Sequence, residues 1–141
     1  MLQTDEIVRL GQIELHFRVD PAANAESMTA FDLHLPPAAR VPAAHYHRSV
    51  DELFLVQRGT IRYTIDGVVS DLAAGEHRFV PRGAVHHFIN VGTEPAQALV
   101  VLTPGTIGPA FFREVAAAAA GGPPDPNVIA AIMDRHGLVP A

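Results

Sequence analysis

Residues 45–52 read HYHRSVDE, and this stretch gives the clearest indication of both the fold and the chemistry of the chain. His45 and His47 are two residues apart, so on a β-strand both imidazoles point to the same face. The next turn of the chain brings Glu52 onto a neighbouring strand, and a later strand supplies His86. Three neutral imidazoles with one carboxylate suit iron, manganese, nickel, zinc or copper better than calcium or magnesium. The sequence therefore predicts one divalent transition-metal ion per chain.

The segments on either side of this stretch have the pattern of β-strands. From residue 13 to residue 102 the dominant apolar period is two, which is typical of strands with one buried face. Ile61, Tyr63 and Ile65 alternate in this way up to Asp66-Gly67, a dipeptide that favours a tight hairpin turn. Seven or eight short strands at regular spacing predict an all-β sandwich or barrel.

The pattern changes to a helical one after Pro104. Residues 111–120 are good helix formers followed by a glycine pair, and Asp125-Pro126 offers a cap and first turn for a second helix that Gly137 ends. The second helix has one apolar stripe, which would pack against the barrel or a partner subunit, or close a pocket as a mobile lid. We expect a single domain of residues 1–141, with a barrel core over 13–102 and a helical extension over 105–141.

Composition excludes several functional classes. With 141 residues, 48% of them hydrophobic and 18% charged, the chain has enough apolar surface for one complete core. The net charge of -5 includes no run of Lys or Arg, so neither nucleic acid nor a membrane surface is an expected partner. The absence of cysteine excludes disulfides and thiol catalysis. No apolar leader is visible, so we expect a cytoplasmic protein.

Two motifs carry a family resemblance. The first is His45-x-His47, four residues, Glu52, six residues and Gly59; the second is Gly75, five residues, Pro81-x-Gly83, two residues, His86, three residues and Asn90. Together they resemble the paired motifs of the cupin superfamily, over about residues 28–102. The family has Gly where this chain has Ala39, which affects a turn and not a ligand. The short spacing between the motifs is similar to that of small bacterial single-domain, quercetinase-like cupins.

The resemblance implies a fold and several functions. The expected fold is the cupin double-stranded β-helix, a jelly-roll barrel, with two C-terminal helices. The first functional hypothesis is a metal-dependent dioxygenase acting on a small organic substrate, in which Glu52 also accepts a substrate proton. The second is a non-redox isomerase, decarboxylase or lyase of a small sugar or carboxylate, with the metal as Lewis acid. The third is a binding or sensing module without turnover.

Four residues are candidates for the substrate pocket. Phe54, Tyr63 and Phe88 share the inward face of their strands with the metal ligands, although core packing would also explain them. Arg78 would suit an anionic substrate if it points inward, and would form a surface salt bridge if it points outward. His87 follows His86 directly and should point to the opposite face.

An apolar outer surface is the basis for the expected oligomeric state. Leu53–Leu55 is apolar on both faces of its strand, and Leu99–Leu102 is a second uninterrupted apolar run. Together with the resemblance, these segments predict a homodimer with a hydrophobic interface.

Overall fold

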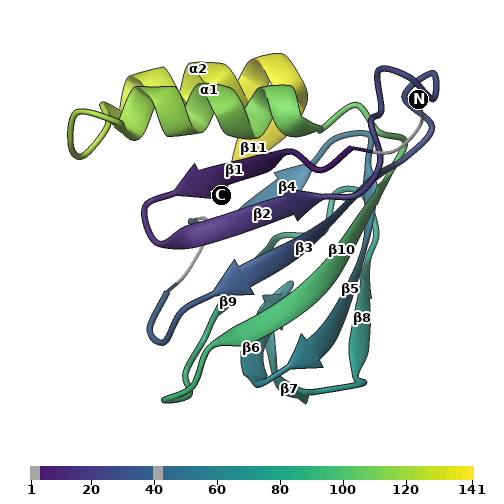
Figure 1. The fold of residues 1–141 in the computed structure, drawn as a ribbon, viewed down its shortest axis with the longest axis vertical. Coiled ribbons are helices and arrows are strands. Elements are labelled where there is room, and N and C mark those ends of the chain that lie inside the picture. The colour runs from purple at the N-terminus through teal and green to yellow at the C-terminus, as the bar shows by residue number, and fades with distance from the viewer. Residues whose placement is uncertain (1–3, 40–42) are drawn as a thin grey trace.

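The computed structural model describes residues 4–39 and 43–141, which form two β-sheets with a pair of helices at one end (Figure 1). Residues 1–3 and 40–42, which the expected domain of residues 1–141 includes, lie outside the described residues. The strands are β1 (Ile7–Leu10), β2 (Ile13–Phe17), β3 (Thr29–Leu35), β4 (His45–His47), β5 (Asp51–Arg58), β6 (Thr60–Ile65), β7 (Val68–Ala73), β8 (His77–Val80), β9 (His86–Ile89), β10 (Ala96–Thr103) and β11 (Leu138–Pro140). The helices are α1 (Pro109–Ala119) and α2 (Pro126–His136).

The two sheets form the front and back of a barrel. The front sheet in Figure 1 has six strands in the order β1-β2-β3-β10-β5-β8, and the sheet behind it has five in the order β11-β4-β9-β6-β7. Neighbouring strands pair antiparallel in both sheets. The prediction of an all-β jelly-roll barrel with two C-terminal helices is confirmed.

Alternating burial along each strand produces the core between the sheets. In β10 the side chains of Ala96, Ala98, Val100 and Leu102 are buried, and the residues between them are half-buried. Full burial of a side chain such as Leu102 contributes about 1.5–3 kcal/mol. The period of two that the sequence shows therefore marks the inward face of the barrel.

Two glycines satisfy specific backbone requirements of this barrel. Asp66 and Gly67 have φ angles of 46° and 81°, and they form the turn of the β6–β7 hairpin as predicted. Gly59 lies between β5 and β6 with φ 76°, and a Cβ atom added there would lie 2.9 Å from the Cβ of Ala96. A larger residue would push β5 away from the start of β10, which explains Gly at the end of the first motif.

Asn90 ties the end of the second motif to the barrel. Its side-chain amide is fully buried and donates to the carbonyl oxygens of Leu35 at 3.0 Å and Glu94 at 2.9 Å. Its Oδ1 accepts a hydrogen bond from the backbone N–H of Gly92 at 2.9 Å. These hydrogen bonds hold the segment after β9 against the end of β3.

The helices lie side by side across one end of the barrel, next to β1 and β11 (Figure 1). α1 starts two residues before the predicted segment 111–120. α2 starts as predicted, because the side chain of Asp125 caps it by accepting a 2.8 Å hydrogen bond from the N–H of Asn127. The apolar side chains of Phe111, Ile132 and Met133 are buried. Within the described part of the chain, neither helix is long and apolar enough to cross a membrane.

The sheets extend beyond the expected barrel core of residues 13–102. β1 precedes that range, and β11 follows α2 and pairs with β4, so that Leu138 lies opposite His47 and Pro140 opposite His45. A strand of three residues is too short to show an alternating pattern, and its partner lies about 90 residues away in the chain. The sequence pattern therefore could not reveal it.

Candidate metal centre

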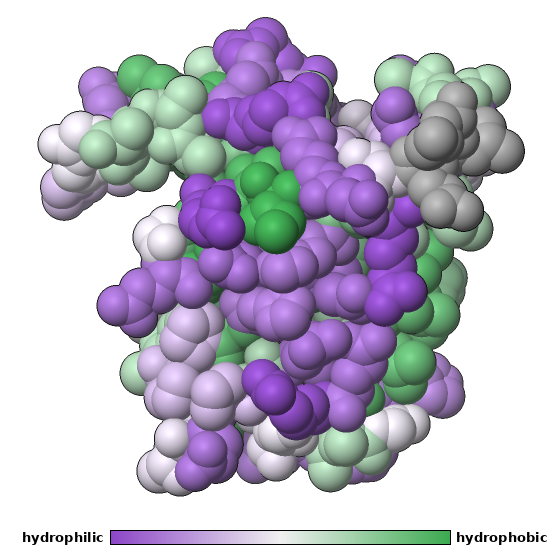
Figure 2. All heavy atoms as spheres, viewed as in Figure 1, coloured by the Kyte–Doolittle hydropathy of each residue, from purple (hydrophilic) through white to green (hydrophobic). Residues whose placement is uncertain are grey.

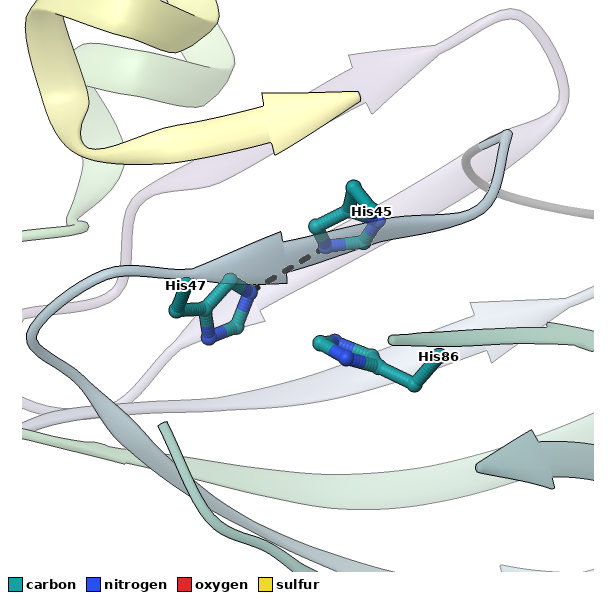
Figure 3. A group of neighbouring side chains, drawn as sticks. All are labelled: His45, His47 and His86. Atoms are coloured by element: carbon teal, nitrogen blue, oxygen red, sulfur yellow. Dashed lines mark hydrogen bonds between the residues drawn. The ribbon is translucent and has the colours of Figure 1, made fainter. Parts of the chain in front are cut away.

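β4 presents His45 and His47 to the interior of the barrel. Both side chains are buried, whereas Tyr46 between them is half-buried and points to the other face of the strand. The Nε2 atoms of the two imidazoles are 3.1 Å apart (Figure 3). The two-residue spacing therefore places two imidazoles together, as predicted.

β9 brings the third imidazole to the same point. His86 pairs in register with His45 and is only 1% exposed. The ring centroid of His86 lies 4.4 Å from that of His45 and 4.7 Å from that of His47 (Figure 3). One ring nitrogen from each of the three histidines lies within 4.8 Å of the others, so this group could hold a metal ion.

Backbone carbonyls determine which ring nitrogens face the centre. The Nδ1 atoms of His45 and His86 lie 3.1 Å and 2.9 Å from the carbonyl oxygens of Ala43 and Ala84. A carbonyl oxygen can only accept, so each Nδ1 carries the proton and each Nε2 keeps a lone pair. The Nε2 of His45 lies within hydrogen-bonding distance of the Nε2 of His47, so both nitrogens face the same point, as two ligands of one cation would. The donor set therefore fits a metal ion.

Glu52 lies beside this group without being part of its tightest cluster. It is a buried residue of β5, and its Oε1 is 3.9 Å from Nε2 of His86. Its Oε2 accepts a hydrogen bond from the hydroxyl of Tyr63. One carboxylate oxygen is thus held by Tyr63, while the other faces the imidazoles.

Burial keeps the imidazoles of β4 neutral. Loss of water around His45, and repulsion from His86 whenever both are protonated, lower the pKa of His45 from 6.5 to about 4. The same loss of water, and repulsion from His86 and His45 when they are protonated, lower the pKa of His47 from 6.5 to about 3. Burial and the charge of Glu52 raise the pKa of Tyr63 well above its usual value, so Tyr63 remains a hydrogen-bond donor. At neutral pH the two imidazoles are therefore in the form that binds metal.

Acidification should destabilise the metal-free protein. In the unfolded chain His45 and His47 take up protons near pH 6.5, whereas in the folded chain they stay neutral down to about pH 4 and 3. The unfolded state then binds more protons below pH 6.5, so stability present above that pH is lost as the pH falls. At about 1.4 kcal/mol per pH unit, each histidine should cost roughly 2 kcal/mol by pH 5. Urea unfolding of chelator-treated protein at pH 7 and pH 5 would measure the loss.

The matched control is a double variant in which His45 and His47 are both replaced by glutamine. Because glutamine does not titrate, the variant should lose less stability than the native chain over the same pH step. An equal loss in both proteins would contradict the prediction.

A cavity of about 110 Å³ opens above the imidazoles. Among the described residues that line it, His45, His47, Glu52 and His86 are the polar side chains, and all the others are aliphatic or aromatic. The side of the cavity formed by the two helices consists of Phe111, Phe112, Val115, Ile129 and Met133. The candidate metal centre is thus the polar end of an apolar pocket.

The structure separates the four predicted pocket residues. Phe54 and Phe88 line the cavity, whereas Tyr63 is not among its lining residues and contacts Glu52 instead. Arg78 pairs with Phe54 but lies on the edge strand β8, where its guanidinium donates to the carbonyl oxygen of its neighbour His77 at 2.7 Å. Arg78 therefore does not line this cavity.

The helical wall of the cavity, which is the side formed by α1 and α2, contains none of the residues predicted for the pocket. The one feature of the sequence that pointed to it was the apolar stripe of the second helix.

The Tyr63–Glu52 contact can be tested with Tyr63→Phe. The change keeps the aromatic ring and removes the donor to Glu52, leaving a buried carboxylate oxygen with one partner fewer. We expect a loss of about 1–3 kcal/mol in unfolding free energy and metal binding about 10–100-fold weaker. Tyr46→Phe makes the same chemical change on the outer face of β4 and should alter neither quantity. Urea unfolding and chelator competition would measure them, and identical effects of the two variants would exclude a role for the contact.

Fold and site together define a two-sheet barrel with a buried three-histidine group at its centre. A family model described as Cupin domain matches residues 31–102, just over half of the chain. The chain belongs to the cupin family, and the resemblance inferred from its two motifs is confirmed at that level. The finer likeness to quercetinase-like cupins is not specifically supported.

Comparisons with individual proteins agree with this family. Germin-like protein 9-3 of Oryza sativa subsp. japonica is 37% identical over 83 residues, which are 56% of this chain and 39% of that protein. The chain thus spans well under half of the length of this relative. A predicted oxalate decarboxylase of Thermotoga maritima superposes with a TM-score of 0.63 at 21% identity, covering 72% of this chain and 93% of that one. A protein of Silicibacter pomeroyi described as a sugar phosphate isomerase from a cupin superfamily superposes with a TM-score of 0.57 at 26% identity. The superposition covers 64% of this chain and 59% of that one.

Proposed function

We propose that the protein is a metal-dependent cupin enzyme, of dioxygenase type, that acts on a small organic molecule. The observation that carries this proposal is the group of three buried imidazoles with the Glu52 carboxylate beside it, which together line one cavity. Such a set of polar groups is costly to bury without a cation. The proposed ligands are His45, His47, His86 and Glu52.

The donor set limits the choice of ion. Imidazole and carboxylate ligands suit iron, manganese, nickel, zinc or copper. An ion held by these four residues would supply Lewis-acid activation of a substrate and, if it were a redox metal, reactivity toward dioxygen. In the proposed oxidative cleavage, both oxygen atoms enter the product and the substrate supplies all four electrons that dioxygen takes up, so no external reductant is required.

The protein's own residues would handle the substrate proton. Oε1 of Glu52 faces the imidazoles and is the proposed acceptor of an acidic substrate proton. Tyr63 holds Oε2 of the same carboxylate and so fixes the direction of Oε1. The buried walls, including Phe54 and Phe88, would keep water away from the reacting groups.

A second candidate function is a non-redox isomerase, decarboxylase or lyase. It is favoured by the structural likeness, at 26% identity, to a protein described as a sugar phosphate isomerase. The lining of the cavity argues against a sugar phosphate, because outside the proposed ligands the described lining side chains offer no hydrogen-bonding partner. A sensing module that binds without turnover is the third candidate.

Metal analysis and oxygen uptake would separate these candidates. The protein should be purified without added metal or chelator, analysed for bound metal, and then offered diols, flavonols and thiol acids in an oxygen electrode. Bound iron with substrate-dependent oxygen consumption is the expected result. Bound zinc or nickel with product formed and no oxygen consumed would favour the second candidate, and tight binding without any product would favour the third.

The proposed assembly is a homodimer formed through the outer face of β8, β5 and β10. Leu53 and Phe79 are neighbours on this face and are 38% and 58% exposed, and Val101 lies beside Leu53. Figure 2 shows hydrophobic side chains at the edge where β5 and β8 lie, while the face over β2 and β3 is mostly hydrophilic. A cytoplasmic location also stays a prediction, which cell fractionation would test.

Phe79→Glu should convert this dimer to a monomer. A carboxylate at the centre of an apolar interface loses its water without gaining a partner, which disfavours association. Sedimentation equilibrium should give twice the chain mass for the native protein and the chain mass for the variant. Val68→Glu, which alters an exposed valine on β7 of the other sheet, is the control and should leave the mass unchanged. A native protein that sediments as a monomer would refute the assembly.

A further inference from the structure

The lining of the cavity restricts what can enter it. Apart from the three imidazoles and Glu52, the described lining residues have hydrocarbon side chains, with a Met133 thioether as the one exception. A second carboxylate, a phosphate or a row of hydroxyls on a substrate would therefore lose its water and find no partner. Burying such a group unpaired costs several kcal/mol. The cavity thus selects against sugars, sugar phosphates and dicarboxylates.

The size of the cavity gives a second restriction. Its volume is about 110 Å³, whereas an engineered apolar cavity of about 150 Å³ is large enough to bind benzene. Because this cavity is the smaller of the two, a body about the size of benzene is the largest that we expect to fit without rearrangement. A flavonol has three rings and would need the helical wall, which includes Phe111 and Met133, to move outward.

We propose that the site takes a small, uncharged oxygen chelator of the 1,3-diketone or catechol type, with a short alkyl or aryl body packed against α1 and α2. The position of its chelating head rests on the proposed function. Such a molecule enters the apolar cavity without a charge to desolvate, in contrast to a dicarboxylate. Its acidic proton then moves to Oε1 of Glu52, and the negative charge left on its oxygens faces the imidazoles of His45, His47 and His86.

The α2 side chains Ile129 and Met133 are the proposed determinants of substrate length. Met133 is buried and lines the cavity from its helical side, and Ile129 is a half-buried lining residue one helical turn away. Both occupy the wall that faces the body of the substrate and not the metal-binding end. Shortening either one should enlarge the cavity without changing the ligand set.

Isothermal titration of zinc-loaded protein can test the selectivity without turnover. The matched probes are 2,4-pentanedione and malonate, whose two carbonyl oxygens have the same spacing. Pentanedione ends in methyl groups, whereas malonate has charged oxygens at the same positions. We expect pentanedione to bind at least about tenfold more tightly than malonate. Equal or tighter binding of malonate to protein with full zinc occupancy would overturn the proposal.

The helical wall is tested with a longer diketone. Met133→Ala should improve the binding of 3,5-heptanedione relative to pentanedione, and Met133→Leu, which nearly conserves volume, should not. If Met133→Ala fails to fold, Ile129→Ala provides the same comparison at a less buried position. If the ratio of the two diketone affinities is unchanged in a folded alanine variant, Met133 and Ile129 do not determine substrate length.

A metal-free experiment separates this inference from the proposed function. Benzene has no chelating group, so it should raise the melting temperature of chelator-treated protein simply by filling the apolar cavity. If zinc does not bind in stoichiometric amount, the proposed metal centre is wrong, and stabilisation by benzene would still support the apolar cavity. No stabilisation by benzene at saturating concentration would overturn the inference whatever the metal result.

Discussion

Replacing His47 by alanine is expected to abolish stoichiometric metal binding. His47 is one of the three imidazoles whose ring nitrogens lie within 4.8 Å of one another, and its Nε2 is 3.1 Å from that of His45. Its loss leaves two imidazoles and one carboxylate, with a gap on the β4 side of the site. Metal content per chain should fall from about one ion to less than about a tenth, measured by plasma mass spectrometry on protein purified without chelator. Full occupancy in the variant would show that the ligand assignment is wrong.

His87→Ala provides the matched control for this experiment. His87 follows His86 on β9, but it is half-buried and points to the opposite face, where it lies beside Thr64 of β6. The chemical change is the same as in His47→Ala, and His87 is adjacent in sequence to the proposed ligand His86. Because its side chain points away from the site, metal content should be unaffected. Circular dichroism of both variants would establish that any loss of metal is not a loss of fold.

Glu52→Gln should lower turnover by about 10²–10⁴-fold. The amide has nearly the shape of the carboxylate, and its oxygen can still accept the hydrogen bond from Tyr63. It cannot take up a proton, so the proposed general base is lost. Metal binding should weaken less than in His47→Ala, because three imidazoles remain. The measurement is substrate-dependent oxygen uptake, expressed per bound iron.

The comparison must be made at equal metal occupancy. Glu94→Gln removes a carboxylate from the exposed surface and should leave both metal content and turnover unchanged. If Glu52→Gln turns over at the native rate per bound ion, Glu52 is not the base. If its metal content falls as far as that of His47→Ala, Glu52 acts mainly as a ligand.

The parts of the site that the sequence predicts are those set by local geometry. The spacing of His45 and His47 requires only that residues two apart on a strand share a face. The position of His86 follows from the second motif, which the pairing of β4 with β9 places opposite the first. The alternation in strands such as β10 likewise predicts which side chains point inward. The two features that depend on alternation along one strand need no knowledge of which strands become neighbours, whereas the position of His86 was predicted only through the second motif.

The remaining features depend on contacts between distant segments. The apolar stripe of α2 predicts that Ile129 and Met133 pack against something, but a stripe alone does not identify the surface that it meets. Alternation along the strand of Arg78 likewise cannot predict that this strand lies at the edge of the sheet. Arg78 is paired there with Phe54 and does not line the cavity. Tyr63 was expected in the pocket wall, whereas its hydroxyl instead holds Glu52 through a contact between β5 and β6.

The direct continuation of α2 into β11 links the two ends of the pocket. Met133 and Leu138 both line the cavity, and Leu138 lies opposite His47 in the β11–β4 pairing. A molecule resting on this segment therefore touches the same piece of backbone that borders the strand of the imidazoles. Any coupling that this segment transmits between the cavity and the proposed metal centre must be reciprocal: the factor by which a bound ion changes the affinity for an organic ligand equals the factor by which that ligand changes the affinity for the ion.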